Sequence, residues 1–336
     1  MNAAERALLG AVIVVAAIVP FVLSGYNLYL VDLVLMTSIG AMALNLLIGN
    51  TGQVSLGNAA FLGIGAFSGV FIGTLWHLPF AVAVVGAMIV AGFIGLVVGI
   101  PALRLRGMYL LLATLAVHYV FFFVANLYQQ NTVGPSGFNL PKASIFGWQP
   151  QTQRDWYFVM LAAAAAVAFV ASNLLRTRAG RAWALIQYKE PVASALGIPV
   201  AKYKIIAFVL SSMMIGLQGV IGAYFLGNVS VEQWDLNTAI SYVAMIVLGG
   251  LGSVWGAVVG AAIVTLLPTV IGNVLAAPGV PSVLASSAGP ITTTVYGVLI
   301  VTMLLTAPRG IAGLVRDRIR TVPKPVLPAV HGAAAG

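Results

Sequence analysis

The chain has no cysteine among its 336 residues, and only 7% of them are charged. Without cysteine there can be no disulfide, no thiolate metal ligand and no cysteine nucleophile. Soluble globular domains have about 25% charged residues, whereas this chain is 61% hydrophobic. A protein dissolved in water cannot bury that much apolar surface in its core. The composition therefore predicts a protein whose solvent is the lipid bilayer.

Motifs that would mark an enzyme are also missing. No G-x-x-x-x-G-K-[ST] phosphate loop surrounds any of the lysines, which excludes ATP hydrolysis by that route. No H-E-x-x-H motif and no nucleophile elbow occur, and His77, His118 and His331 lie far apart in the sequence. We therefore expect no catalytic residues, no metal and no cofactor.

Ionisable groups are nearly absent from the apolar segments. Proton- or sodium-coupled carriers usually need buried carboxylates, and here only Asp32 and His118 are candidates. We interpret Asp32 as an interfacial residue near the outer end of a span. His118 either bonds a neighbouring helix or faces the permeant. This scarcity indicates that the energy for transport comes from outside the chain.

Charged residues and Gly/Pro clusters divide the chain into about ten apolar segments, each near the length that crosses a bilayer. The expected spans are 7–25, 28–48, 55–75, 79–100, 107–127, 156–175, 205–226, 238–251, 254–274 and 291–307. Segment 238–251 is short enough to be a broken or re-entrant helix. The prediction is an all-α polytopic membrane protein in which residues 1–308 form one transmembrane domain that begins with an uncleaved span.

The basic residues orient this domain. With ten spans and a cytoplasmic N-terminus, all of the 16 Lys and Arg residues except Lys142 and Arg154 fall on the cytoplasmic side. Both termini are then cytoplasmic, the basic tail 309–336 is expected to be disordered, and the longest outer loops are 128–155 and 227–237. Orientation thus explains the net charge of +9 better than nucleic acid does.

Six of the basic residues lie in one cytoplasmic loop, residues 176–204. The run from Ala182 to Lys189 favours a short helix. Pro191 suits the first position of a second helix, where its missing N–H costs nothing. Gly197 suits the end of that second helix. We therefore expect two short helices parallel to the membrane in this loop.

The same loop has the residues for a small apolar face. Leu185, Val192 and Leu196 would form that face, with Arg181 and Lys189 turned away from it. Composition alone leaves two interpretations open. The loop is either a docking surface for another protein or an amphipathic segment that contacts anionic lipid headgroups.

Two glycine-rich segments, 49–66 and 249–260, are similar to one another. Small residues let helices approach closely in lipid, so we interpret most of these glycines as packing positions. Gln53, Ser55 and Asn58 add uncharged hydrogen-bonding groups, which either support packing or line a pathway for a small polar solute, as His118 would. The similar glycine turns are consistent with a weak internal repeat.

Several motifs, in order along the chain, resemble the membrane-spanning permease subunits of branched-chain amino-acid ABC importers, a family that also includes urea and amide permeases. The motifs are GNTGQVSLGNAAF (49–61), LRLRGMY (103–109), ATLA (113–116), TVGPSG (132–137), GRAWALI (180–186), ASALGI (193–198), GGLGSVWG (249–256), YGVLI (296–300) and PRG (308–310). One stretch departs from the family. A charged Arg-Glu/Asp-Asn/Asp-Glu run is usual where this chain has QYKE (187–190), and only Glu190 fits.

The resemblance implies an amino-acid permease subunit in a bacterial inner membrane. Its implied partners are a second, different permease subunit, two ATP-binding subunits and an extracytoplasmic solute-binding protein. It identifies the loop 176–204 as the ATPase-docking segment, and urea or a short amide remains the alternative solute. A stand-alone channel or secondary carrier is the alternative from another class. The expected docking residues are Gly180, Arg181, Leu185, Lys189, Glu190, Leu196 and Gly197.

Overall fold

The computed structural model describes residues 18–23, 25–102, 107–144, 147–276, 288–306 and 310–313, and helices make up most of them. This confirms the predicted all-α class. The α-helices are α2 (Tyr26–Thr51), α3 (Asn58–Val70), α4 (Phe80–Ala102), α5 (Met108–Thr132), α6 (Gln153–Arg176), α7 (Arg178–Tyr188), α8 (Glu190–Ala195), α9 (Val200–Leu226), α10 (Leu236–Gly249), α11 (Val254–Leu275) and α13 (Ala288–Thr306).

Short elements connect these helices. A π-helical turn, η1 (Phe71–Leu75), extends α3. Two 3-10 turns, η2 (Gly134–Ser136) and η3 (Val231–Trp234), follow α5 and precede α10. Two short strands, β1 (Phe138–Asn139) and β2 (Asn228–Val229), form an antiparallel pair. This pair joins the two loops that the sequence predicted as separate outer connectors.

Seven helical segments in the described part of the chain are long and apolar enough to cross a membrane. They are α2, α3 with η1, α4, α5, α6, α9 and α11, and each corresponds to one expected span. A chain with this many apolar helices is confirmed as polytopic.

The other three expected spans differ. α10 corresponds to segment 238–251 and has only 14 residues, too few for a full span. α13 corresponds to segment 291–307 and is not among the seven. Segment 7–25 lies mostly outside the described residues. The total of ten spans, and with it the cytoplasmic placement of both termini, therefore stays a prediction.

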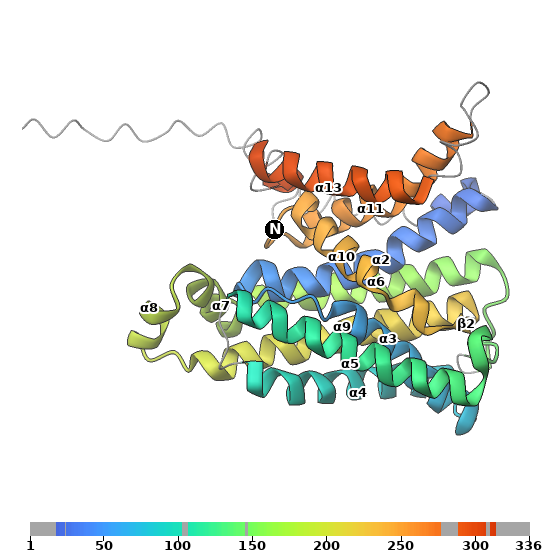
Figure 1. Cartoon of the computed structure of the whole chain (residues 1–336), viewed down its shortest axis with the longest axis horizontal. Helices are drawn as coiled ribbons and strands as arrows, with labels where there is room; N and C mark the ends of the chain where they lie inside the picture. Colours follow the sequence, from blue (N-terminus) through green and yellow to red (C-terminus); the bar gives the residue numbers. More distant parts are fainter. Residues whose placement is uncertain are drawn as a thin grey trace, which may run out of the picture.

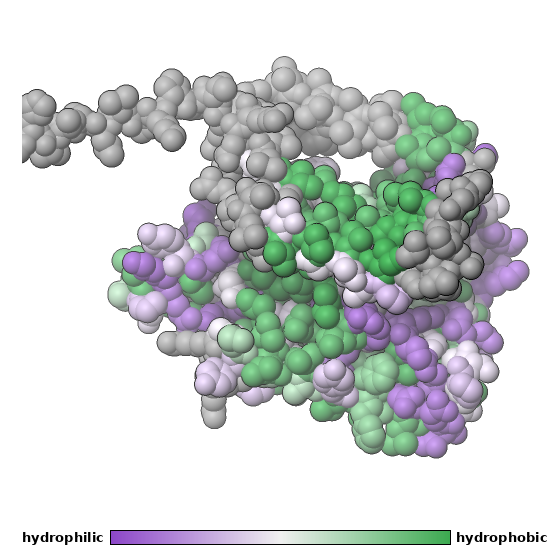
Figure 2. Space-filling view, turned by 45° about the horizontal axis from the view of Figure 1, so that its top comes forward, coloured by the Kyte–Doolittle hydropathy of each residue, from purple (hydrophilic) through white to green (hydrophobic). Residues whose placement is uncertain are grey.

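The long helices run side by side, with α7 and α8 projecting at one end and β2 at the opposite end (Figure 1). α9 lies at the centre and packs against α2, α3 and α4. α10 and α11 pack against α2 and each other, and α13 packs on both. The hydrophobic surface lies in the middle of the molecule, and hydrophilic residues gather toward its ends (Figure 2). This pattern suits a bundle whose sides face lipid.

Glycine allows the central helices to touch. A Cβ atom on Gly65 of α3 would lie 2.2 Å from the carbonyl oxygen of Gly216 in α9. One on Gly219 would lie 2.0 Å from the carbonyl oxygen of Leu62. No side chain fits at these distances, so the backbones of α3 and α9 cross in direct contact, as small residues permit in membranes.

Candidate docking site and translocation residues

α7 is held on the bundle by a buried tryptophan. The side chain of Trp183 is completely buried, and its Nε1 donates a hydrogen bond of 2.8 Å to the carbonyl oxygen of Tyr203 in α9. Ala182 and Ile186 are buried beside it. A buried indole satisfied in this way anchors α7 to the start of α9.

α8 is anchored to the same place by charge. Glu190 opens the helix, and its Oε2 lies 2.7 Å from Nζ of Lys204, near the start of α9. Pro191 occupies the first turn and Gly197 follows the helix with φ +76°. Gly197 lies where the sequence predicted, and Pro191 lies one position later than predicted but still in the first turn, because proline tolerates the first turn and glycine the left-handed region. The two predicted short helices are therefore present.

The apolar face of the loop differs from the predicted one. The residues turned toward the protein are Trp183 and Ile186, whereas Leu185 is half-buried. Val192 and Leu196 are exposed, and Leu196 has 68% of its surface accessible. The prediction grouped Leu185, Val192 and Leu196 and left out the inward face that Trp183 forms with Ile186. The loop has one apolar face directed inward and a second apolar group that is exposed.

Of the remaining docking candidates, Gly180 allows a tight turn, and Arg181 and Lys189 lie on the exposed surface. Gly180 leaves no room for a side chain, since a Cβ atom there would lie 2.2 Å from the carbonyl oxygen of Leu175 at the tight α6–α7 turn. Arg181 and Lys189 are exposed, and one guanidinium nitrogen of Arg181 donates to the carbonyl oxygen of Arg176 at 3.3 Å. The outward surface of α7 and α8 is thus basic with apolar members.

The side chains of Gln53 and Ser55 are buried, on a non-helical segment between α2 and α3 in which Gly52 and Val54 are exposed. Nε2 of Gln53 donates to Oγ1 of Thr51 at 2.9 Å and to the carbonyl oxygen of Lys204 at 3.3 Å. Oγ of Ser55 accepts a bond of 3.2 Å from the N–H of Gly57. Irregular backbone at this depth needs such partners, because lipid supplies none.

Asn58 and His118 lie on α3 and α5, which pack against each other. Asn58 opens α3, and its Nδ2 donates to the carbonyl oxygen of Ala239 in α10 at 3.5 Å. His118 lies on α5 one turn beyond Thr114, whose hydroxyl accepts from the N–H of Leu56 at 3.1 Å. In the described part of the chain, Oδ1 of Asn58 and Nδ1 of His118 have no hydrogen-bond partner.

All four candidates for the pathway are therefore buried, but they lie in two places. Asn58 bonds α10 and His118 lies on α5, whereas Gln53 bonds the carbonyl oxygen of Lys204 in α9 and lines a pocket together with Gln187 and Lys204. Their role as pathway residues stays a prediction, and the unpaired atoms of Asn58 and His118 are its most specific support. The sequence reasoning missed Thr114, although a threonine in an apolar helix is a signal for such a bond.

Asp32 has a partner that the sequence did not predict. Its side chain is completely buried between α2 and α6, and Oδ2 accepts a bond of 2.5 Å from Nε2 of Gln153, the first residue of α6. The prediction that Asp32 lies near the outer end of the span therefore stays open, and what it left out is the cover that α6 provides. Oδ1 has no hydrogen-bond partner within the described ranges. The sequence could not show this burial, because it depends on α6 covering α2.

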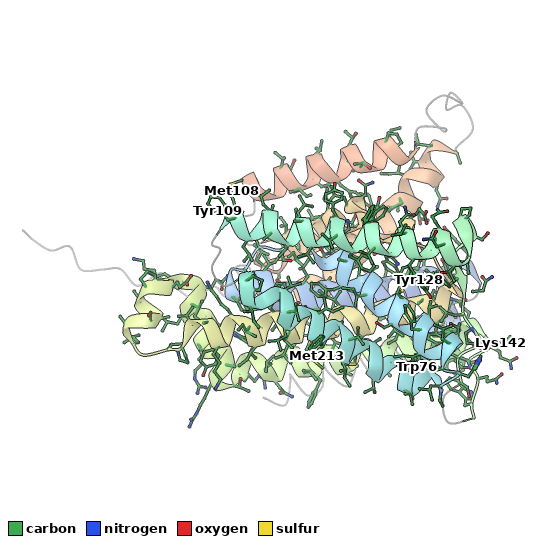
Figure 3. The ribbon with its side chains drawn as sticks, turned by 60° about the horizontal axis from the view of Figure 1, so that its bottom comes forward. Trp76, Met108, Tyr109, Tyr128, Lys142 and Met213 are labelled. Carbon is green, nitrogen blue, oxygen red and sulfur yellow. The ribbon has the colours of Figure 1, made fainter. Side chains whose placement is uncertain are left out.

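Labelled side chains show which loops lie at each end of the bundle. Met108 and Tyr109 begin α5 at the end where α7 and α8 project, and Lys142 lies at the opposite end (Figure 3). Lys142 is one of the two basic residues that the orientation rule leaves outside. The α7–α8 segment and the loop that contains Lys142 thus lie at opposite ends of the long helices.

The sequence matches a family model described as "Branched-chain amino acid transport system / permease component" over residues 26–307. The match covers all seven membrane-crossing helical segments. The chain belongs to this family. It is a multi-pass permease protein of the bacterial inner membrane.

Two curated relatives carry the name "High-affinity branched-chain amino acid transport system permease protein LivM". The one from Escherichia coli K12 is 28% identical over 281 residues, which are 76% of this chain and 66% of the relative. The one from Salmonella typhimurium is 27% identical over 286 residues, 78% of this chain and 67% of the relative. The chain thus spans about two thirds of the length of these relatives. No solved structure matches it.

Proposed function

We propose that this permease is one of two different membrane subunits of an ABC importer for amino acids, branched-chain ones in particular. Its partners would be two ATP-binding subunits on the cytoplasmic side and an extracytoplasmic solute-binding protein. The observation that carries the proposal is the α7–α8 pair, which is anchored to the bundle on one side and open on the other.

The anchoring favours a protein partner over lipid for this loop. An amphipathic segment that lies on a bilayer inserts its large apolar side chains among the acyl chains. α7 instead buries Trp183 and Ile186 in its own protein. What remains outside includes Arg181 and Lys189 together with the exposed Tyr188, Val192 and Leu196. Apolar side chains next to cations suit a docking interface with an acidic rim.

The anchors also explain how a motor could act through this loop. Trp183 and Glu190 both bond to the first turn of α9, at Tyr203 and Lys204. A push on α7 and α8 by closing ATP-binding subunits would reach the central helix directly. The permease would then rock between two states as packed bundles do, in discrete steps.

The solute class is supported by the family and by the chemistry of the bundle. Both relatives are named for branched-chain amino acids. The pathway candidates Gln53, Ser55 and Asn58 carry dipoles but no charge. Such groups let a zwitterion pass without holding it as a buried ion pair would. Urea or a short amide would also pass, and a solute-binding protein would then make the selection.

The docking proposal is tested by charge reversal. Arg181→Glu with Lys189→Glu should reduce co-purification of the ATP-binding subunits at least tenfold, because the variant repels an acidic rim. Lys142→Glu with Arg154→Glu, at the other end, is the matched control and should change nothing. Retention of the ATP-binding subunits by the first variant would refute the docking assignment.

The stand-alone channel or carrier makes the opposite prediction for transport. The purified chain in proteoliposomes should not move leucine, whereas the complete complex should do so only with ATP. Leucine flux through the chain alone, without nucleotide, would favour the channel or carrier and contradict the proposal. Competition by excess urea or acetamide in the complete complex would identify the alternative solute.

A further inference from the structure

The two glycine-rich segments meet in space. Gly49, in the last turn of α2, lies against Gly252 in the turn between α10 and α11. A Cβ atom on Gly49 would lie 2.3 Å from the backbone nitrogen of Gly252. Gly252 itself has φ +79°, in the region that glycine favours. Because neither position can hold a side chain, the two backbone segments are in direct contact.

Asn45 fastens this contact from one side. It lies one turn before Gly49 on α2 and is only 1% exposed. Its Nδ2 donates to the carbonyl oxygen of Ser253 at 2.7 Å, and its Oδ1 accepts from the N–H of Gly252 at 2.9 Å. The Asn45 side chain thereby pairs one backbone acceptor and one backbone donor of the α10–α11 turn. Breaking such a buried set leaves polar groups unpaired, which is costly.

Gln187 fastens the same turn of α2 from the other side. Its Nε2, on α7, donates a bond of 2.8 Å to the carbonyl oxygen of Gly49. That carbonyl belongs to the last turn of α2, where the helix itself offers no N–H partner. The end of α2 is therefore held between the docking loop and the α10–α11 turn.

The protein encloses α11, on the far side of this junction, less than it encloses α9, since 28% of the most apolar window of α11 is buried compared with 67% for α9. α9 is packed along its length between α2, α3 and α4, whereas α10 and α11 pack mainly on α2 and each other. The turn between them also has Gly250 at φ 119°. At Gly49 and Gly252 the contact is backbone to backbone, so a displacement of the end of α2 meets the turn directly, and the glycines of the turn tolerate the rotation that follows.

We propose that Asn45 and Gln187 are positioning residues that carry the movement of the docking loop, through the last turn of α2, to the α10–α11 turn. This inference rests on the proposed function and adds the route by which nucleotide binding reaches the peripheral helices. Loss of either residue should leave docking intact and uncouple the turn from the loop.

The absence of native cysteine from this chain makes the test direct, since labels can be introduced at chosen positions without background from it. Spin labels at Ser194→Cys in α8 and at Leu251→Cys in the turn are each paired with a reference label at Val133→Cys beyond the outer end of α5. All three positions are exposed. Pulsed electron resonance measures both distances in the complete complex, without nucleotide and with ATP plus vanadate.

In the unsubstituted complex, nucleotide should shift both distances. In Asn45→Leu the Ser194 pair should shift as before, whereas the shift of the Leu251 pair should fall by at least half. Leucine transported per ATP hydrolysed should fall about fivefold, a coupling loss at the lower end of the range for linked sites. Asn126→Leu, on the half-buried part of α5, is the control.

Gln187→Met keeps the size of the side chain and removes the donor, so it should act in the same direction. It decides the question if Asn45→Leu does not assemble. An unchanged shift of the Leu251 pair in both variants, with unchanged transport per ATP, would overturn the inference while the docking assignment stands. A Ser194 pair that ignores nucleotide in the unsubstituted complex would overturn the proposed function, and this inference with it.

Discussion

α9 and α5 are similar in length and both are apolar, yet they occupy different environments. In the most apolar window of α9, 67% of residues are buried inside the protein, compared with 22% in α5. α9 carries Gly216, Gly219 and Gly222 together with small serines, whereas α5 carries a run of tyrosines and phenylalanines. In lipid, hydropathy marks a span, and residue size marks which spans the protein itself surrounds.

The same distinction separates two faces of α4. The face that packs on α9 consists of small residues at intervals of four, namely Ala83, Ala87, Ala91, Gly95 and Gly99. The opposite face exposes Val82, Ile89 and Phe93 among other large apolar residues. A helix with no polar face can thus still have one face that packs on protein and another that faces outward. We call α2, α3 and α9 the inner bundle, and α4, α5, α6 and α11 the outer helices.

The largest expected effect comes from closing a backbone contact. Gly219→Leu would place a side chain where a Cβ atom already lies 2.0 Å from a backbone oxygen of α3. Overpacking costs about 1–3 kcal/mol where side chains can give way, and here only backbone is available. The variant should lose its folded peak in detergent size-exclusion chromatography. Gly272→Leu on α11, which has nothing within 4 Å, should elute like the unsubstituted chain, and equal behaviour of both would break the distinction.

Truncating a ring should give the next largest contrast. Phe208 of α9 is 1% exposed and packs on Phe61, whereas Phe93 of α4 is 65% exposed. Phe208→Ala leaves a cavity and should cost about 3–5 kcal/mol. Phe93→Ala should cost well under 1 kcal/mol, because lipid fills the space. Thermal denaturation in detergent, followed by loss of the monodisperse peak, measures both. A large loss for Phe93→Ala would mean that another protein covers that face.

A buried hydrogen bond provides a smaller test. Nε2 of Gln218 donates to the hydroxyl oxygen of Tyr242 and so links α9 to α10. Tyr242→Phe would leave the amide without this acceptor in a buried site, at a cost of about 1–3 kcal/mol. Tyr119→Phe on the exposed surface of α5 removes a hydroxyl of the same kind and should be neutral. Denaturation midpoints that fall equally in both variants would show that the bond carries no specific stability.

The helices and turns could be predicted from the sequence more fully than the burial and the contacts of single residues. Seven spans, Pro191 at the start of α8 and Gly197 after it follow from local rules, because length, turn chemistry and charge act within a few residues. The burial of Asp32 and the inward direction of Trp183 do not, since each depends on a helix far away in the chain. Gly49 and Gly252 were both recognised as glycine turns, but only the fold shows that they touch.

The smallest expected effect concerns the first turn of α10. Asp235 caps α10, with Oδ1 accepting from the N–H of Thr238 at 2.8 Å. Burial raises the pKa of Asp235, but the bonds from Thr238 and Asn237 outweigh it and hold that pKa below its usual value. The group therefore stabilises the folded state above its unfolded pKa, and this contribution is lost as the pH falls through the folded pKa.

Asp235→Ala should cost about 0.5–2 kcal/mol at neutral pH, the usual value of an N-cap. The difference from the unsubstituted chain should shrink as the pH falls, because the protonated carboxyl caps less well. Asp235→Asn should keep most of the stability and lose the pH dependence, since an asparagine oxygen accepts the same bond at any pH. Denaturation midpoints at pH 7 and in acid separate these outcomes. A cost for Asp235→Ala that is the same in acid would mean that the α10 end depends on shape alone, and that its charge contributes nothing.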